Sequence, residues 1–174
     1  MKFKDVPKFT SEGQYNADMR LPYFIRWIDE NIKELGLQLN PDFQRGNVWT
    51  EQQQIAYIEY LIKGGKSAIT VYFNQPGWQR DYKGEFVCVD GLQRITAMQK
   101  FLNNKIKIFG HYLNEYEDSK ILLRKLIIKV NINNLQTKKE VLQWYLDMNT
   151  GGTVHSEKEI DKVKNMINEL EKEN

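Results

Sequence analysis

The segment Asp90-Gly91-Leu92-Gln93-Arg94 combines residue types that can bind a phosphate group or a cation. The Asp90 carboxylate can cap a helix or ligate a cation. Gly91 lets a ligand approach the backbone, and the free N–H groups of a following helical turn attract anions. Arg94 would lie in that first turn, where the helix dipole disfavours a cation. We therefore expect Arg94 either to point into solvent or to share an anion with the helix end.

Gln44 and Arg45 form a second candidate group, in a loop between the aromatic residues Phe43 and Trp49. Large aromatic side chains would hold this loop on the domain. A rigidly held loop that carries Arg and Gln is one way in which a scaffold presents phosphate-binding groups. The alternative is that Arg45 is a solvated loop residue, and the residues alone leave both interpretations open.

A strand and a helix must position the Asp-Gly turn. Residues 86–89 form a short, β-branched, apolar run that is typical of a strand covered on both faces, and Ile95, Met98 and Leu102 recur at helical spacing. Cys88 lies within the strand and is the only cysteine, so no internal disulfide can form. We expect Cys88 to be a small buried hydrophobic residue rather than a catalytic thiol.

Apolar periodicity predicts the other elements, and Gly or Pro residues mark several of their ends. We expect helices over residues 21–35, 50–62, 138–148 and 156–174, and strands over residues 68–74, 105–109 and 126–132. This order predicts a small α+β domain with a mixed sheet and packed helices. Residues 1–20 would be an irregular lead-in, residues 21–155 the α+β domain, and residues 156–174 a C-terminal helix that packs on its own domain or on a partner protein.

Several function classes are disfavoured by composition and spacing. Gly65-Lys66-Ser67 looks like the end of a P-loop, but Tyr60 stands where that motif needs a glycine, and the predicted order is helix before strand. Two histidines and one cysteine give no metal-site spacing. The formal net charge is only +2, so a DNA-binding surface would have to be a local patch. No segment has the length and apolarity to span a bilayer, and we expect a cytoplasmic protein.

Three short motifs occur together and in a fixed order: residues 41–45 (PDFQR) with Val48-Trp49, residues 89–97 (VDGLQRITA), and residues 148–153 (MNTGGT). On these motifs the chain resembles the N-terminal domain of GmrSD-type modification-dependent restriction systems. That family was first catalogued as a domain of unknown function and is similar to the ParB and sulfiredoxin-like fold. The resemblance covers residues 20–165 and implies a bacterial or phage-infected cell as the host.

The resemblance implies that the two arginine-bearing segments face each other across a pocket for a nucleoside triphosphate. Asp90 would organise a Mg²⁺ ion or a water, Gln93 would orient the water or the phosphate, and Arg94 with Arg45 would hold phosphate oxygens. The activity implied is binding and slow hydrolysis of the nucleotide, coupled to DNA restriction or to phage counter-defence. The same motifs supply the other candidate phosphate- or nucleotide-binding residues, Gln44, Gly91, Thr96 and Asn149.

Two departures from the family pattern modify this expectation. Leu92 stands where the family usually has Gln, and the loss of that polar contact would weaken turnover more than binding. Larger family members continue into a His-Asn-His nuclease half, whereas we expect this chain to act alone or with a separate nuclease or partner subunit.

Two other functions are alternatives to nucleotide binding. The first is a protein-interaction subunit. The second is a non-catalytic ParB-like DNA-binding module, whose local basic patch would comprise Lys63, Lys66, Arg80 and Lys83.

Overall fold

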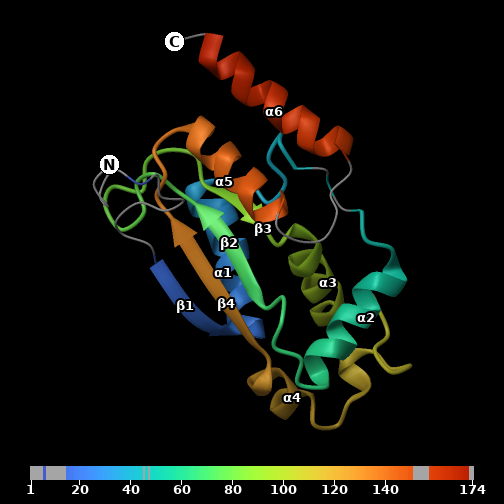
Figure 1. Cartoon of the computed structure of the whole chain (residues 1–174). Coiled ribbons are helices and arrows are strands. Elements are labelled where there is room, and N and C mark those ends of the chain that lie inside the picture. The colour runs from blue at the N-terminus through green and yellow to red at the C-terminus, as the bar shows by residue number, and fades with distance from the viewer. Residues whose placement is uncertain (1–5, 7–14, 45, 47, 151–156, 173–174) are drawn as a thin grey trace.

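A four-stranded mixed sheet forms the centre of the molecule. The computed structural model describes residues 6, 15–44, 46, 48–150 and 157–172. The strand order is β1-β4-β2-β3, in which β4 runs antiparallel to β1 and parallel to β2, and β2 runs antiparallel to β3 (Figure 1). The strands are β1 (Tyr15–Arg20), β2 (Thr70–Asn74), β3 (Val87–Asp90) and β4 (Ile127–Asn133).

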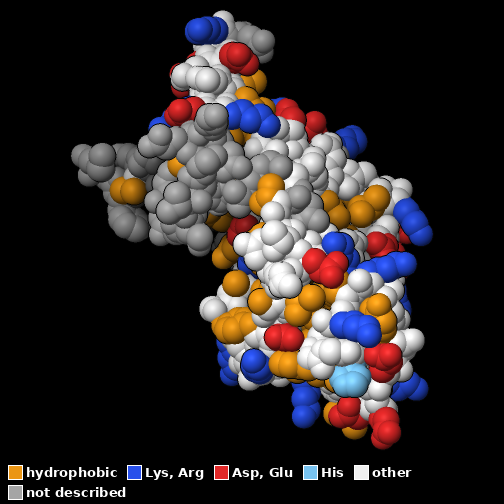
Figure 2. Space-filling model, turned by 90° about the vertical axis from the view of Figure 1, so that its right-hand side faces the viewer, with side chains coloured by type: hydrophobic (Ala, Val, Ile, Leu, Met, Phe, Trp, Pro, Cys, Tyr) orange, Lys and Arg blue, Asp and Glu red, His pale blue; other side chains and the backbone are white. Residues whose placement is uncertain are grey.

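Within the described residues, six α-helices surround this sheet. Local sequence fixes several of their ends: Gly36 closes α1 in the left-handed conformation, and Thr50 with Gln53 forms the capping box that opens α2. On the side of the molecule that carries α2 and α3, acidic and basic side chains are intermixed (Figure 2). The helices are α1 (Leu21–Leu35), α2 (Glu51–Ile62), α3 (Leu92–Leu102), α4 (Ser119–Lys125), α5 (Lys138–Thr150) and α6 (Glu157–Lys172).

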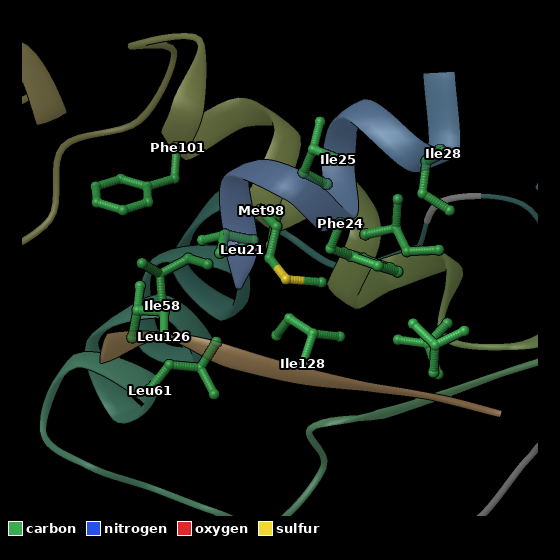
Figure 3. Close-up of a cluster of buried hydrophobic side chains, with 14 of the residues drawn as sticks. Leu21, Phe24, Ile25, Ile28, Ile58, Leu61, Met98, Phe101, Leu126 and Ile128 are labelled. Atoms are coloured by element: carbon green, nitrogen blue, oxygen red, sulfur yellow. The ribbon is translucent and has the colours of Figure 1, made fainter. Parts of the chain in front are cut away.

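The larger hydrophobic cluster lies between one face of the sheet and helices α1, α2 and α3. Side chains from all three helices meet β4 there (Figure 3). Full burial of each such side chain stabilises the fold by about 1.5–3 kcal/mol relative to exposure. The labelled members of this cluster are Leu21, Phe24, Ile25, Ile28, Ile58, Leu61, Met98, Phe101, Leu126 and Ile128.

A second, smaller cluster lies on the other face of the sheet, over β3. Val87 and Val89 pack there against α5 and α6, which contribute Trp144, Val163 and Ile167 among others. The last helix therefore packs on its own domain, as one of the two expectations held. Because α5 and α6 cover this face of the sheet over β3, the same face of β1 and β4 carries exposed side chains.

The α+β class, the mixed sheet and the C-terminal helix are confirmed. The expectation of an irregular lead-in over residues 1–20 is wrong for Tyr15–Arg20, which forms β1. Its exposed polar and half-buried apolar residues alternate, as in a strand with one covered face. This alternation is itself a sequence signal for a strand, and the mixed polar and aromatic residues before it concealed that signal.

Two further elements differ from expectation. Residues 105–109 contribute no strand, and only an isolated bridge joins Ile108 to His111 across a tight turn in which Phe109 has a φ of 48°. The apolar run that precedes β4 contains the short helix α4, which the alternation of Lys and Arg with apolar residues concealed. The predicted start of the last helix, at residue 156, lies outside the described residues.

Candidate functional site

Gly91 forms the turn from β3 into α3 and is the N-cap of that helix, with a φ of 129°. A Cβ atom at this position would lie 2.5 Å from Cγ1 of Val71, so close packing alone requires glycine here. Of the two roles left open for Asp90, helix capping is not found, because no side chain caps α3. The Asp90 carboxylate is instead bonded to Arg94.

Arg94 is held inside a network of protein acceptors. Its Nη2 donates to Oδ2 of Asp90 at 2.6 Å, and its Nη1 donates to the backbone oxygens of Thr70 at 2.7 Å and Ala68 at 3.2 Å. The Arg94 side chain is 10% exposed, whereas that of Asp90 is 42% exposed. Arg94 therefore does not point into solvent, and the charge that balances it comes from Asp90, four residues earlier. The ion pair joins the end of β3, the start of β2 and the first turn of α3.

Gln93 joins the same turn to the loop that precedes α2. Its Oε1 accepts hydrogen bonds from the backbone N–H groups of Val48 and Trp49, both at 3.0 Å, and its Nε2 donates to the carbonyl of Gly46 at 2.5 Å. A single amide side chain thus satisfies three backbone groups of the loop. This arrangement fixes the loop against the N-terminus of α3.

Gln44 makes a matching connection from the loop to β3. Its Nε2 donates to the carbonyl oxygens of Cys88 and Val89, both at 2.9 Å. Arg45 lies outside the described residues, but its sequence neighbours Gln44 and Gly46 are both hydrogen-bonded to this junction. The two motifs therefore lie in direct contact, and the pocket between them that the resemblance implied stays a prediction.

The N-terminus of α3 carries neither a capping side chain nor an acidic residue in its first turn. The first helical hydrogen bond runs from the N–H of Ile95 to the carbonyl of Gly91. The N–H groups that precede Ile95 therefore have no acceptor within the helix, and the positive end of the helix dipole is not neutralised by a cap. Leu92 is 7% exposed, and the Thr96 hydroxyl donates to the Leu92 carbonyl at 2.9 Å. Thr96 is thus bonded within its own helix.

Two buried groups border the Asp90–Arg94 pair. The Tyr57 hydroxyl donates to the Ala68 carbonyl at 3.1 Å, and burial raises the pKa of this phenol to about 12. Burial also raises the pKa of the Cys88 thiol, with a smaller contribution from the Asp90 charge. Cys88 is therefore a neutral buried residue, as expected. Sequence reasoning missed Tyr57, because its contact is a backbone carbonyl that no residue type reveals.

The remaining candidate residues are not part of this network. Asn149 donates through Nδ2 to the carbonyl of Tyr145, within α5, at 2.6 Å. Among the described residues, no hydrogen bond joins Asn149 to Asp90 or Arg94. Residues 151–153 of the third motif lie outside the described ranges.

The basic residues proposed as one DNA-binding patch are divided between two places. Lys63 and Lys66 precede β2, whereas Arg80 and Lys83 belong to the connection that leaves the other end of that strand. The Lys63 ammonium lies 5.2 Å from the centre of the Phe109 ring. Lys83 is 3.5 Å from the carboxylate of Asp81. The expectation of a single patch formed by these four residues is therefore wrong.

A cavity of about 320 Å³ lies near the first residue of β3. It is lined by residues of the PDFQR motif and by the first turn of α5, but not by Asp90, Gln93 or Arg94. Its charged lining residues are Asp42, Glu85 and Lys138, and Asp42 is ion-paired to Lys138 at 2.6 Å. Two carboxylates and one paired lysine do not attract a polyphosphate.

The described residues show neither a metal-binding cluster nor a membrane-spanning helix. No three His, Cys, Asp or Glu side chains gather there as a group that could hold a metal ion. No helix within those ranges combines the length and apolarity needed to cross a membrane.

Comparison with known proteins identifies the family of the chain. Neither the curated proteins nor the solved structures contain a match to this chain, so the ParB-like relationship stays a prediction. The family model described as GmrSD restriction endonuclease, N-terminal domain, matches residues 26–169. That range includes both motifs that meet at the β3–α3 turn, and it extends through most of α6. The chain therefore belongs to the family of GmrSD restriction endonuclease N-terminal domains.

Proposed function

We propose that this restriction-system component binds a nucleoside triphosphate where the β3–α3 turn meets the loop over residues 44–49. The main support for this proposal is the N-terminus of α3, which has no capping side chain. This N-terminus lies against the loop that carries the Gln44-Arg45 motif. Backbone N–H groups at such a terminus attract phosphate oxygens, and the helix dipole adds to that attraction. Arg45 would contribute the second positive group, as a charge-assisted donor to phosphate.

Gln93 and Arg94 act in this proposal by positioning the site. Gln93 uses its carbonyl oxygen twice and its amide nitrogen once to hold the loop, and this favours a structural role over the orientation of a water. Arg94 holds Asp90 and the first residues of β2. Slow turnover is consistent with this arrangement and with Leu92, which offers no polar group.

The residues present fit a Mg²⁺ ion that is bound mainly by the nucleotide. Asp90 is one half-exposed carboxylate with an oxygen bonded to Arg94, and Mg²⁺ commonly takes one or two carboxylates and completes its shell with water and phosphate oxygens. The ion would neutralise charge on the phosphates during hydrolysis. Asp90 would hold the ion, and Arg94 would keep the Asp90 carboxylate in place.

The two alternative functions receive less support. A DNA-binding module in which Arg94 meets backbone phosphates requires an accessible guanidinium, but Arg94 is buried and bonded to three protein oxygens. A subunit that docks through its last helix requires a free apolar face. The apolar residues Val163 and Ile167 of α6 are already buried against α5.

The test is calorimetric titration of the purified chain with ATP, GTP, CTP and UTP in the presence of Mg²⁺, with phosphate release followed in parallel. Arg45→Ala should weaken binding roughly ten- to hundredfold, which corresponds to the loss of one charge-assisted hydrogen bond. Asp90→Asn should leave the nucleotide affinity measured without Mg²⁺ unchanged. It should reduce the increase in nucleotide affinity that Mg²⁺ causes.

Arg80→Ala is the matched control, because Arg80 is an exposed arginine in the connection between β2 and β3. Arg94→Ala is a poor first variant, since it removes three hydrogen bonds and would lower the free energy of unfolding by on the order of 2–3 kcal/mol. Unchanged affinity in folded Arg45→Ala, or no binding of any nucleotide by the wild type, would refute the proposal.

A further inference from the structure

The side of β1, β4 and β2 that faces away from the larger cluster presents two rows of polar side chains. The pairing registers place Asn16, Asn131 and Tyr72 in one row. They place Asp18, Lys129 and Thr70 in the next row. Residues directly opposite one another on paired strands point to the same face, so each row forms a continuous strip across three strands.

A groove of about 370 Å³ lies at the end of this face, where the connection after α2 meets the end of α4. Lys66 comes from that connection, Lys125 from the last turn of α4, and Lys129 from β4. Gly64 and Gly65 also line the groove, and no side chain lies within 4 Å of the position that a Cβ would take at Gly64. Two regions distant in sequence, one at Lys66 and one over residues 125–129, thus bring three ammonium groups to one concave surface.

None of these three lysines has an ion-pair partner within the described part of the chain. By contrast, Lys83, Lys138 and Lys139 each lie within 4 Å of a carboxylate. Asp18 is the one acidic residue that lines the groove, and all three lysines are exposed. Three lysines against one aspartate give the groove a net positive charge, although the whole chain is near neutral.

A second hollow, of about 410 Å³, continues from the first and shares Asp18 and Lys129 with it. It is lined by the polar rows of the sheet face, including Asn131. Asn131 is 4% exposed and donates to Oδ1 of Asn16, while its own Oδ1 has no hydrogen-bond partner among the described residues. A buried acceptor without a donor favours a hydrated or polar occupant over an apolar one.

We propose that the two hollows form a single trough that binds the phosphate backbone of duplex DNA. Lys66, Lys125 and Lys129 supply mobile ammonium groups, which suit backbone phosphates and require no particular base sequence. The family to which the chain belongs takes its name from restriction endonucleases, so duplex DNA is the polyanion that its system meets. This surface is separate from the β3–α3 turn, so DNA and nucleotide would bind at different places.

The test measures binding of a fluorescent duplex by anisotropy at several salt concentrations, beginning near about 50 mM because non-specific binding is weak. The triple variant Lys66→Gln, Lys125→Gln, Lys129→Gln should bind about tenfold or more weakly than the wild type. The slope of log affinity against log salt should fall by about 0.9 for each lysine that contacts a phosphate. The three single variants should each show about one third of the change in slope.

A second triple variant provides the control for net charge. Lys33→Gln, Lys105→Gln and Lys164→Gln remove three exposed lysines from α1, the segment after α3, and α6, and this protein should bind DNA like the wild type. Equal losses in both triple variants, wild-type affinity in the groove variant, or no binding by the wild type would each refute the proposal. Tighter binding of polyglutamate than of DNA at the groove would also refute it, because the occupant would then be an acidic protein segment.

Nucleotide titrations of the same variants separate this proposal from the previous one. The groove variant should keep wild-type nucleotide affinity, and Arg45→Ala should keep wild-type affinity for DNA. If no nucleotide binds, the DNA measurement still tests the trough. If no DNA binds, the nucleotide titration still tests the β3–α3 turn.

Discussion

The polar side chains at the β3–α3 turn direct most of their hydrogen-bonding groups to backbone atoms of other segments. Gln44 and Arg94 donate to carbonyl oxygens, and Gln93 bonds to two N–H groups and one carbonyl. The sequence motifs predicted that these residues belong to one site. They did not predict the partners, because a backbone carbonyl such as that of Ala68 has no signature in the residue type.

Replacement of Gln93 should loosen the loop before α2. Gln93→Ala removes all three hydrogen bonds to Gly46, Val48 and Trp49 and should lower the free energy of unfolding by about 1–3 kcal/mol. Amide exchange at Val48 and Trp49 should accelerate at the same time. Denaturant unfolding and hydrogen exchange measure the two effects.

Gln99→Ala is the control, since Gln99 lies on the same helix and no described interaction involves its side chain. This change should leave stability within about 0.5 kcal/mol of the wild type. If both variants behaved alike, the loop would be held by contacts other than those of Gln93.

Tyr57 should titrate later than an ordinary tyrosine. Its pKa is raised from 10.0 to about 12, chiefly by burial, so the folded state holds the phenol proton more tightly than the unfolded state does. The associated stability is complete below pH 10 and is lost as the pH rises towards 12. Near-ultraviolet absorbance of phenolate should therefore be the same for wild type and Tyr57→Phe until the pH exceeds about 11. A difference that develops near pH 10 would contradict the buried hydrogen bond to Ala68.

At the level of elements, periodicity predicted the long helices and the central strands, because each has one continuous apolar face. It missed β1, whose pairing depends on β4, and α4, which has no buried residue. It could not decide whether the last helix packs on its own domain. Where α6 packs depends on the surface that α5 and β3 form. The periodicity of α6 carries no information about that surface.

The attachment of α6 can be tested at a single buried side chain. Ile167 lies in the smaller hydrophobic cluster, so Ile167→Ala should lower the free energy of unfolding by about 2–4 kcal/mol. Asn165→Ala, at an exposed position on the same helix, should change it by less than about 0.5 kcal/mol. Denaturant unfolding measures both values. Equal, small effects would show that α6 is only loosely attached.

On the scale of the whole molecule, charge is segregated in a way that composition conceals. The formal net charge of +2 gives no indication of nucleic-acid binding, because the basic residues of the trough are balanced by acidic residues elsewhere. Only the fold brings Lys66 to Lys125 and Lys129. The four basic residues expected from the sequence share only Lys66 with this groove.

The strand order also has a consequence for how the protein is made. β4 is the last strand to leave the ribosome, yet it occupies a central position between β1 and β2. Until β4 emerges, β1 has no strand partner among the described elements, and β2 can pair only with β3. Unpaired strand edges and exposed apolar surface promote aggregation during synthesis. The nascent chain should therefore depend on chaperones until β4 has emerged, and production at lower temperature should raise the yield of folded protein.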